Sequence, residues 1–338
     1  MIDSSVGSDN LVSARDLTVE FVLGRGILRR GGARLRAVDG VSLEIARGTS
    51  VGLVGESGCG KSSLGRGLLG LVARTGGTLD FDGIDLGSVS RRGMRSLRRR
   101  MQLVYQDPYS SLDPRMTVEQ LLEEPLRIHR TVPRAGRSAR VSELLNLVSL
   151  DRGKRPKFPH ELSGGQRQRV AIAQALASAP EFLVCDEPVS ALDVSVQAQI
   201  INLLIDLREE LGLTFLFIAH DLDIVKHTAD RVLVMYLGKV VERGDTRQVF
   251  ASARHPYTES LLAASPVLSG VREKVMAGPQ LHDELPSAAN VPTGCRFHPR
   301  CWLYQKLGEP EICSKLEPEE AEVALGHSSA CHFAMEMA

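Results

Sequence analysis

A glycine-rich loop at residues 55–62 carries the clearest chemistry in the sequence. It reads G-E-S-G-C-G-K-S, a complete G-x-x-x-x-G-K-S pattern, and lies between a short apolar run and a helix-forming stretch. The glycines let successive backbone N–H groups wrap around an anion, and the helix predicted to begin near Lys61 adds its positive dipole end. Lys61 would neutralise the β- and γ-phosphates of a nucleotide, and the Ser62 hydroxyl would ligate Mg²⁺. The pattern therefore predicts a site for ATP and Mg²⁺.

Eight residues of the loop and of the first helical turn are candidate nucleotide ligands: Gly55, Ser57, Gly58, Cys59, Gly60, Lys61, Ser62 and Ser63. Cys59 occupies a variable position of the pattern, so we interpret it as a small filler and not as a nucleophile. A chance glycine-rich turn is the alternative for the whole segment. A chance turn would not explain why a predicted strand, a predicted helix and the Lys-Ser pair occur together with the glycines.

Two carboxylates follow a second apolar run, and a histidine follows a third. Asp186 and Glu187 end the run at residues 182–187, and His220 closes the run at residues 214–219. Ligands bind at the carboxyl ends of strands in open α/β sheets. There Asp186 would hold Mg²⁺ through water and Glu187 would polarise the attacking water, a role worth roughly 10²–10⁴ in rate. His220 would contact the γ-phosphate. A capping aspartate and a structural histidine are the alternatives for these residues taken alone.

The elements around these motifs predict an α/β core with a helical insertion. Short apolar runs typical of central parallel strands occur at residues 49–54, 182–185 and 214–219. Residues 194–211 have helical spacing. So do residues 105–162, although prolines at 108, 114, 125 and 133 should break that stretch. We place the helical insertion at about residues 107–175. Further strands are expected at residues 12–23 and 38–45.

The last part of the chain differs in composition from the rest. Prolines become frequent after residue 244. We therefore place a domain boundary near Phe250, with one domain at residues 1–250 and a second at residues 251–338.

The overall composition excludes several classes of protein. Basic and acidic residues number 41 each, so no bulk charge favours nucleic acid or an anionic membrane. No apolar run approaches the roughly 18 to 20 residues of a membrane span, and the first ten residues lack signal-peptide features. Six arginines at residues 91–100 predict the solvated face of a helix, with an electrostatic role toward a membrane or partner as the alternative. We expect a cytosolic chain unless a partner brings it to a membrane.

A second anion-binding motif identifies a family. Residues 162–166 read L-S-G-G-Q and precede a helical stretch and the acidic strand. This arrangement resembles the signature of ATP-binding-cassette (ABC) ATPases, and the resemblance covers about residues 11–250. It implies a P-loop NTPase fold of the ABC type, with an antiparallel β subdomain, a helical insertion and here a small cysteine-containing extension. It also implies head-to-tail dimers, in which the loop of one subunit and the signature of the other enclose each ATP.

The family resemblance assigns further roles, residue by residue. Gln106 resembles the Q-loop glutamine that senses Mg²⁺ and the transmembrane subunits, and His220 resembles the switch histidine. Asp193 lies in a segment similar to the D-loop. Phe21, ahead of an arginine-rich insertion at residues 24–36, is the candidate aromatic partner of adenine. The signature residues that would contact the partner's ATP are Ser163, Gly164, Gly165 and Gln166.

The segments around these motifs are similar to one subfamily, the dipeptide, oligopeptide and nickel importers. The similar segments are residues 105–116, 186–195 and 255–258. The resemblance implies an ATP-hydrolysing translocase subunit for di- and oligopeptide import at the cytoplasmic face of the cell membrane. Implied partners are a second, paralogous ATPase chain, two transmembrane permease subunits and an extracytoplasmic substrate-binding protein. The alternatives are import of nickel or another solute, a soluble ABC ATPase, and a degenerate regulatory subunit.

Four of the six cysteines crowd the extension, namely Cys295, Cys301, Cys313 and Cys331. A reducing cytosol disfavours disulfides between them. Four thiolates suit a zinc site or an iron–sulfur cluster, with His298, His327 and His332 as alternative ligands, but the usual close zinc pairs are missing. Some members of the subfamily with a similar tail hold a [4Fe–4S] cluster. The alternatives at this point are a cluster, zinc, and unmetallated thiols packed in a small domain.

Overall fold

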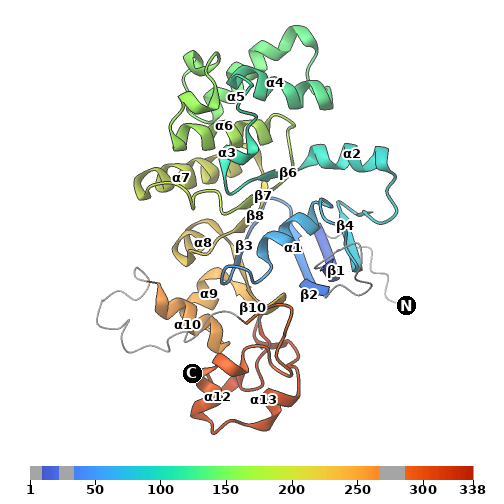
Figure 1. Cartoon of the computed structure of the whole chain (residues 1–338), viewed down its shortest axis with the longest axis vertical. Coiled ribbons are helices and arrows are strands. Elements are labelled where there is room, and N and C mark those ends of the chain that lie inside the picture. The colour runs from blue at the N-terminus through green and yellow to red at the C-terminus, as the bar shows by residue number, and fades with distance from the viewer. Residues whose placement is uncertain (1–9, 23–33, 266–285, 338) are drawn as a thin grey trace, which may run out of the picture. The chain divides into compact units, whose positions relative to one another are not determined.

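The computed structural model describes residues 10–22, 34–265 and 286–337. The first nine residues and most of the predicted insertion at residues 24–36 lie outside this part of the chain. Two compact units divide the chain, one with residues 1–13, 43–49 and 79–216 and the other with residues 14–42, 50–78 and 217–338. Figure 1 labels the elements of both. Among the described residues, no helix has both the length and the apolar character that crossing a bilayer requires.

The second unit places the glycine-rich loop between a buried strand and a helix. All five residues of β3 (Ser50–Val54) are buried, as expected for a central strand. β3 pairs in parallel with β9 (Arg231–Tyr236), and the order continues through β10 (Lys239–Asp245) and β12 (His327–Ser329) to β11 (Ala321–Ala324). The loop leads from β3 into α1 (Lys61–Leu68), which confirms the predicted strand–loop–helix order (Figure 1).

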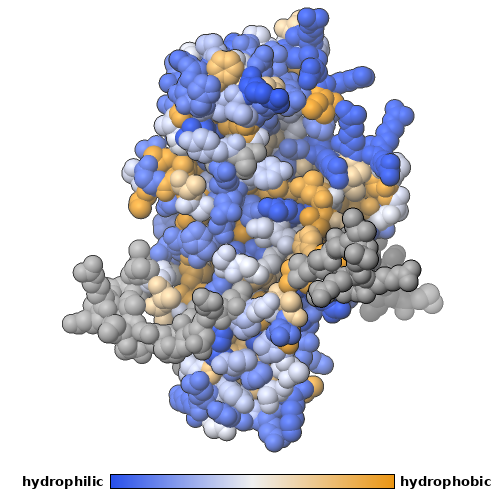
Figure 2. Space-filling view, viewed as in Figure 1, coloured by the Kyte–Doolittle hydropathy of each residue, from blue (hydrophilic) through white to orange (hydrophobic). Residues whose placement is uncertain are grey.

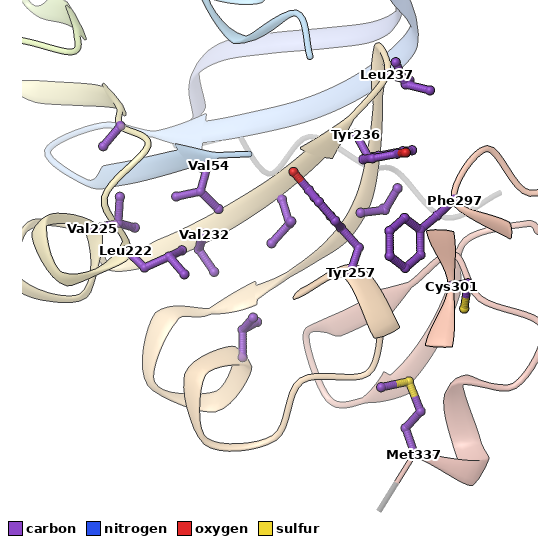
Figure 3. Packing of buried hydrophobic residues seen from close by; sticks show 14 of the residues in the cluster. Val54, Leu222, Val225, Val232, Tyr236, Leu237, Tyr257, Phe297, Cys301 and Met337 are labelled. Carbon is purple, nitrogen blue, oxygen red and sulfur yellow. The ribbon is translucent and has the colours of Figure 1, made fainter. Parts of the chain in front are cut away.

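The cysteine-rich extension continues the sheet that carries the loop. Its strand β12 pairs antiparallel with β10, with Ser329 opposite Glu242. Extension side chains also enter a core with residues of the strands, including Val54, Tyr236, Tyr257, Phe297 and Met337 (Figure 3). Among the described residues of this unit, the remaining helices are α8 (Leu222–Thr228), α9 (Thr246–Ala251), α10 (Pro256–Ala264), η4 (His298–Arg300), α12 (Trp302–Lys306), α13 (Glu311–Lys315) and η5 (Ala334–Glu336). The boundary near Phe250 stays a prediction.

The first unit joins a parallel strand pair to a set of helices. β6 (Met101–Val104) pairs in parallel with β7 (Phe182–Asp186), and Val104 lies opposite Cys185. α7 (Val194–Leu211) fills the predicted helical stretch and leads to β8 (Thr214–Ile218), whose first three residues belong to this unit. The other helices are α2 (Arg91–Arg100), α3 (Pro108–Ser111), α4 (Val118–His129), η1 (Arg134–Gly136), α5 (Arg137–Leu147), η2 (Arg152–Lys154), η3 (Pro159–Glu161) and α6 (Gly164–Leu176).

The arginine-rich segment at residues 91–100 forms a helix, α2, with a solvated surface. Leu97 is the only buried residue of α2, so the arginine-rich segment is a solvated helix as expected. In the view of Figure 2, hydrophilic side chains dominate over α4 and α5, with isolated hydrophobic ones among them. Helices α4, α5 and α6 pack against one another and form the predicted helical insertion.

A separate four-stranded sheet has the order β2-β1-β4-β5. Its strands are β1 (Asn10–Val22), β2 (Arg34–Ala46), β4 (Gly76–Phe81) and β5 (Ile84–Asp85), and β4 pairs antiparallel with β5. Strands were expected at residues 12–23 and 38–45, and both are confirmed.

One expected helix break is wrong. Pro125 lies inside α4 and does not end it. Thr117 and Gln120 form a capping box at the start of this helix. Val118, Leu121, Leu122 and Leu126 are buried along one side. Tertiary packing of this apolar face outweighs the hydrogen bond that proline removes.

Candidate nucleotide site

The glycine-rich loop has a backbone path that only glycine permits at two of its positions. Gly55 has φ 149° and Gly60 has φ 112°. A Cβ on Gly55 would lie 2.2 Å from the Met235 carbonyl oxygen, and one on Gly60 would lie 2.1 Å from that of Ala37. Both the conformation and the close backbone approach therefore require glycine. Strand β9 and the first part of β2 thus lie directly against the loop.

Lys61 is held inside the loop by the loop's own carbonyls. Its side chain is buried, and Nζ donates to the carbonyl oxygens of Gly55 at 2.7 Å and Glu56 at 2.9 Å. No side-chain hydrogen bond caps α1, whose N-cap is Gly60. The N-terminal end of a helix attracts an anion through its backbone N–H groups and its dipole. An ammonium ion and uncapped amides at one loop make a phosphate cradle.

The other residues predicted around the loop differ in exposure. Ser57 and Gly58 are exposed, whereas Ser62 and Ser63 are half-buried in the first turn of α1. Cys59 is 1% exposed, and burial raises the pKa of its thiol. A buried neutral thiol fills space, in keeping with its interpretation as a filler. His220 follows β8 and Phe21 lies near the end of β1, both on the surface of the second unit.

In the first unit, the structure brings two predicted catalytic residues together. Gln106 Nε2 donates to Glu187 Oε2 at 2.9 Å. Asp186 ends β7 and is 2% exposed. Glu187 follows it with φ 47°, a left-handed conformation that costs a non-glycine residue about 1–3 kcal/mol. The Glu187 carboxylate thus lies within hydrogen-bond distance of Gln106 directly after the buried strand.

The signature residues begin helix α6 with a reciprocal cap. Ser163 Oγ accepts from Gln166 N at 3.3 Å, and Gln166 Oε1 accepts from Ser163 N at 3.2 Å. A Cβ on Gly165 would lie 2.5 Å from Val196 Cγ1, and one on Gly164 would lie 3.1 Å from Leu192 Cδ2. The signature glycines therefore allow α6 to approach the D-loop segment and the first turn of α7 closely.

Asp193 has a structural task at the start of α7. Its carboxylate accepts from Val196 N at 3.0 Å and from Ser195 Oγ at 2.7 Å. The bond from Ser195 is the main reason that the pKa of Asp193 is lowered. The D-loop aspartate therefore acts as an N-cap, which fixes the path from the D-loop into the helix.

The four cysteines of the extension lie near one another but are not arranged as a metal site. Burial, together with the charges of the other three cysteines, raises the pKa of Cys331 to about 12. Cys295 N donates to the Cys313 carbonyl at 2.8 Å. Within the described ranges, no group of three or more His, Cys, Asp or Glu side chains could hold a metal ion.

The histidines considered as alternative ligands have other hydrogen-bond partners. His298 Nδ1 contacts the Cys295 carbonyl at 2.9 Å, and His332 Nε2 contacts the Leu316 carbonyl at 2.9 Å. His327 Nε2 lies 2.7 Å from Glu242 Oε1 in the interior. In this arrangement the described residues of the extension do not fit a bound metal.

Two residues near the loop were missed in the sequence. Tyr257 Oη accepts from Glu56 N at 2.8 Å, and Arg300 donates to both carboxylate oxygens of Glu56 at 2.7 and 2.9 Å. In the sequence, the His-Pro-Tyr segment at residues 255–257 indicates the subfamily but not a contact with the loop. Arg300 has no local signal, because its partner lies 244 positions away in the chain.

Comparisons with known proteins agree with these motifs. The ABC transporter family matches residues 38–190, and the family described as "Oligopeptide/dipeptide transporter, C-terminal region" matches residues 241–306. The oligopeptide transport ATP-binding protein AppF of Bacillus subtilis is 43% identical over 335 residues, which are 98% of this chain and 99% of that protein.

Solved structures agree as well. The structure of cbiO1 from Clostridium perfringens, part of the ABC transporter complex cbiONQ, has a TM-score of 0.62 at 30% identity. The match covers 72% of this chain and 91% of cbiO1. The ATP-binding cassette MJ0796, as a dimer in a post-hydrolysis state with ADP and Pi, has a TM-score of 0.61 at 29% identity over 70% of this chain and 99% of that one.

Proposed function

Because this chain belongs to the ATP-binding proteins of ABC transporters, we propose that it is the ATP-hydrolysing motor of a membrane importer for di- and oligopeptides. The main evidence that the substrate is a peptide is the match of residues 241–306 to the C-terminal region of oligopeptide and dipeptide transporters. The near full-length similarity to a protein named for oligopeptide transport supports it.

The loop binds the phosphates of ATP. Phosphate oxygens take the place of the Gly55 and Glu56 carbonyls as partners of Lys61, and the uncapped amides of α1 bind the same anion. Ser62, Gln106 and Asp186 supply oxygen atoms, which are the donors that Mg²⁺ prefers. The ion would neutralise charge on the phosphates. Phe21 stacks on adenine.

Glu187 acts as the base and His220 contacts the γ-phosphate. The bond from Gln106 holds the Glu187 carboxylate in one orientation, ready to accept a proton from the attacking water. Because Gln106 is attached to β6 through exposed Tyr105, movement of the Q-loop would shift the base. Hydrolysis would thus respond to partners bound at the Q-loop.

A second ATPase chain completes each site. Residues 163–166 of one chain would contact the ATP bound by the loop of the other, so the working unit is a head-to-tail dimer. The similar cassette MJ0796 was solved as a dimer in a post-hydrolysis state. We propose that the second ATPase subunit of this dimer is a paralogous chain.

The permease subunits contact the surface around Gln106. A cavity of about 270 Å³ lies beside β6 and α4, lined by residues that include Gln102, Tyr105, Glu124, Ile128 and His129. Tyr105 and Ile128 are 43% and 44% exposed. A hollow with apolar side chains at its edge suits an inserted helix of a permease. Two permeases and an extracytoplasmic binding protein complete the importer, with this chain at the cytoplasmic face.

The [4Fe–4S] cluster is a proposal for the assembled protein only. Its support is the clustering of four cysteines in one small region, while their present arrangement does not fit a metal. No catalytic step involves it. Iron and labile sulfide in anaerobically purified protein would support the cluster. Zinc in their place would indicate a zinc site, and absence of iron, sulfide and zinc would indicate unmetallated, packed thiols.

Reconstitution tests the proposed transport function. The chain is co-expressed with its partner ATPase, permeases and binding protein, and the complex is placed in lipid vesicles. We expect di- or oligopeptides with the binding protein to stimulate ATP hydrolysis and to accumulate inside. Stimulation by a nickel chelate but by no peptide would overturn peptide import and leave the ATPase intact.

A further inference from the structure

Glu56 in the phosphate loop is held on three sides. Its carboxylate receives two bonds from Arg300, at 2.7 and 2.9 Å. Its backbone N–H donates to the Tyr257 hydroxyl at 2.8 Å, and its carbonyl accepts from Lys61 Nζ at 2.9 Å. Two of these three partners, Arg300 and Tyr257, come from the region after residue 250. The extension therefore contacts the nucleotide loop directly.

The two extension residues that hold Glu56 belong to an aromatic cluster or adjoin it: Tyr257 is one of its rings, and Arg300 lies three residues after Phe297. The ring centroids of Tyr236 and Tyr257 are 4.7 Å apart, and each lies 5.3 Å from that of Phe297. Figure 3 shows these three side chains converging from separate segments of the unit. Arg300 ends the short helix η4, which begins next to Phe297. The Arg300 side chain is 3% exposed, so its position is set by packing and not by solvent.

The link also fixes the atoms that hold Lys61. Lys61 donates to the carbonyls of Gly55 and Glu56, and Glu56 is the residue that the extension clamps. A loop held in one conformation loses less entropy when phosphate binds than a loop that must first be ordered. Removal of either charged partner would also leave the other charge poorly compensated in a largely buried position.

We propose that Arg300 and Tyr257 are positioning residues for ATP, through which the C-terminal extension holds the phosphate loop in its binding conformation. The extension thereby sets the affinity of the motor for ATP. Conversely, bound ATP stabilises the segment around Arg300, because coupling between two sites is reciprocal. This inference rests on the ATPase activity and not on the identity of the transported solute.

Matched substitutions test the link. Glu56→Gln and Arg300→Gln remove one charge each, and Arg300→Lys keeps the charge but not the two-bond geometry. Arg243→Gln and Glu320→Gln are the controls, because Arg243 Nη2 and Glu320 Oε2 form a 2.5 Å pair that also joins the cassette to the extension. ATP binding is measured on the full chain in the Glu187→Gln background, and KM and kcat on the assembled transporter.

We expect Glu56→Gln and Arg300→Gln to weaken ATP binding by on the order of 10-fold, with KM raised and kcat changed less than about twofold. Arg300→Lys recovers part of the loss. The double variant loses no more than the larger single loss, since the two residues act as one pair. The controls bind ATP within about twofold of the parent chain, even where they lower the melting temperature.

Hydrogen exchange tests the reciprocal effect. ATP should slow exchange of the amides at residues 297–301 in the parent and in Arg243→Gln, and should not slow it in Glu56→Gln. If Arg300→Gln does not fold, Glu56→Gln tests the same link with the extension intact. Parental ATP affinity in Glu56→Gln, or an equal loss in the controls, would overturn the proposal. A parent chain that binds no ATP would instead contradict the ATPase assignment.

Discussion

At the scale of single residues, the proposed base has an unusual backbone conformation and a hydrogen-bond partner. Glu187 combines a left-handed backbone with a hydrogen bond from Gln106. The amide of Gln106 restricts the rotation of the Glu187 carboxylate. Asp186, one residue earlier, stays buried at the end of β7. Adjacent carboxylates thus have different environments, which suits one for the metal and the other for water.

Glu187→Gln should therefore bind ATP but fail to hydrolyse it. An amide retains the shape and a hydrogen bond to Gln106 but cannot accept the proton, so we expect kcat to fall by at least about 10²-fold. An ATP-bound dimer should accumulate, visible by size-exclusion chromatography. The control is Glu209→Gln, at an exposed position of α7. Full turnover by Glu187→Gln would show that another group is the base.

At the scale of elements, the phosphate loop is compressed between strands of its own unit. Gly60 lies against Ala37 near the start of β2, and Gly55 lies against Met235 of β9. The loop is therefore shaped by tertiary contacts as well as by its glycines. Similarly, α10 begins with a buried cap, since His255 Nδ1 accepts from Tyr257 N at 3.1 Å. This cap positions the tyrosine that contacts Glu56.

Gly60→Ala should abolish ATP binding and lower stability. The new Cβ would meet a backbone oxygen at 2.1 Å at a φ of 112°, so strand or loop must move. Gly83→Ala is the matched control, because Gly83 also has a positive φ of 74° but nothing lies within 4 Å of its Cβ position. Nucleotide titration measures the ATP affinity of both variants, and thermal unfolding measures their stability. Equal ATP affinity in the two would exclude the steric explanation.

His255 should make stability depend on pH. Burial lowers its pKa from 6.5 to about 3. Between these values the unfolded state binds more protons than the folded state, so the free energy of unfolding falls as pH decreases below 6.5. One proton corresponds to a slope of about 1.4 kcal/mol per pH unit. Denaturant unfolding at pH 5 and pH 7 measures this slope.

His255→Asn isolates that effect. Asparagine is a good N-cap residue and does not titrate in this range. We expect a shallower loss of stability between pH 7 and pH 5 than in the parent. His227→Asn, at an exposed position of α8, should keep the parental slope. Because Glu242 and His327 are buried beside this cap, only the difference between variants is assigned to His255.

At the scale of the whole molecule, the extension is part of the unit that binds phosphate. β12 continues the sheet through β10, and Phe297 lies in the same core as Val54 and Tyr236. A substitution in the core of the extension should therefore change the stability of the whole unit and not only that of the extension.

Phe297→Ala should destabilise the full chain by about 3–5 kcal/mol, the usual cost of removing a buried aromatic ring. Phe297 is 1% exposed, whereas Leu325, also in the extension, is 94% exposed. Leu325→Ala should therefore change stability by less than about 0.5 kcal/mol. Denaturant unfolding monitored on the whole chain compares them. Equal stability of the two variants would mean that the extension folds independently of the core.

The sequence by itself determined the family, the fold class, the main strands and helices, and the candidate residues of the nucleotide site. These signals are local, because a phosphate loop, a signature cap or a buried strand is encoded within a few consecutive residues. The bond between Gln106 and Glu187, the intact helix at Pro125 and the clamp of Arg300 on Glu56 were decided only by tertiary structure. Each depends on packing between distant segments, which local spacing does not record.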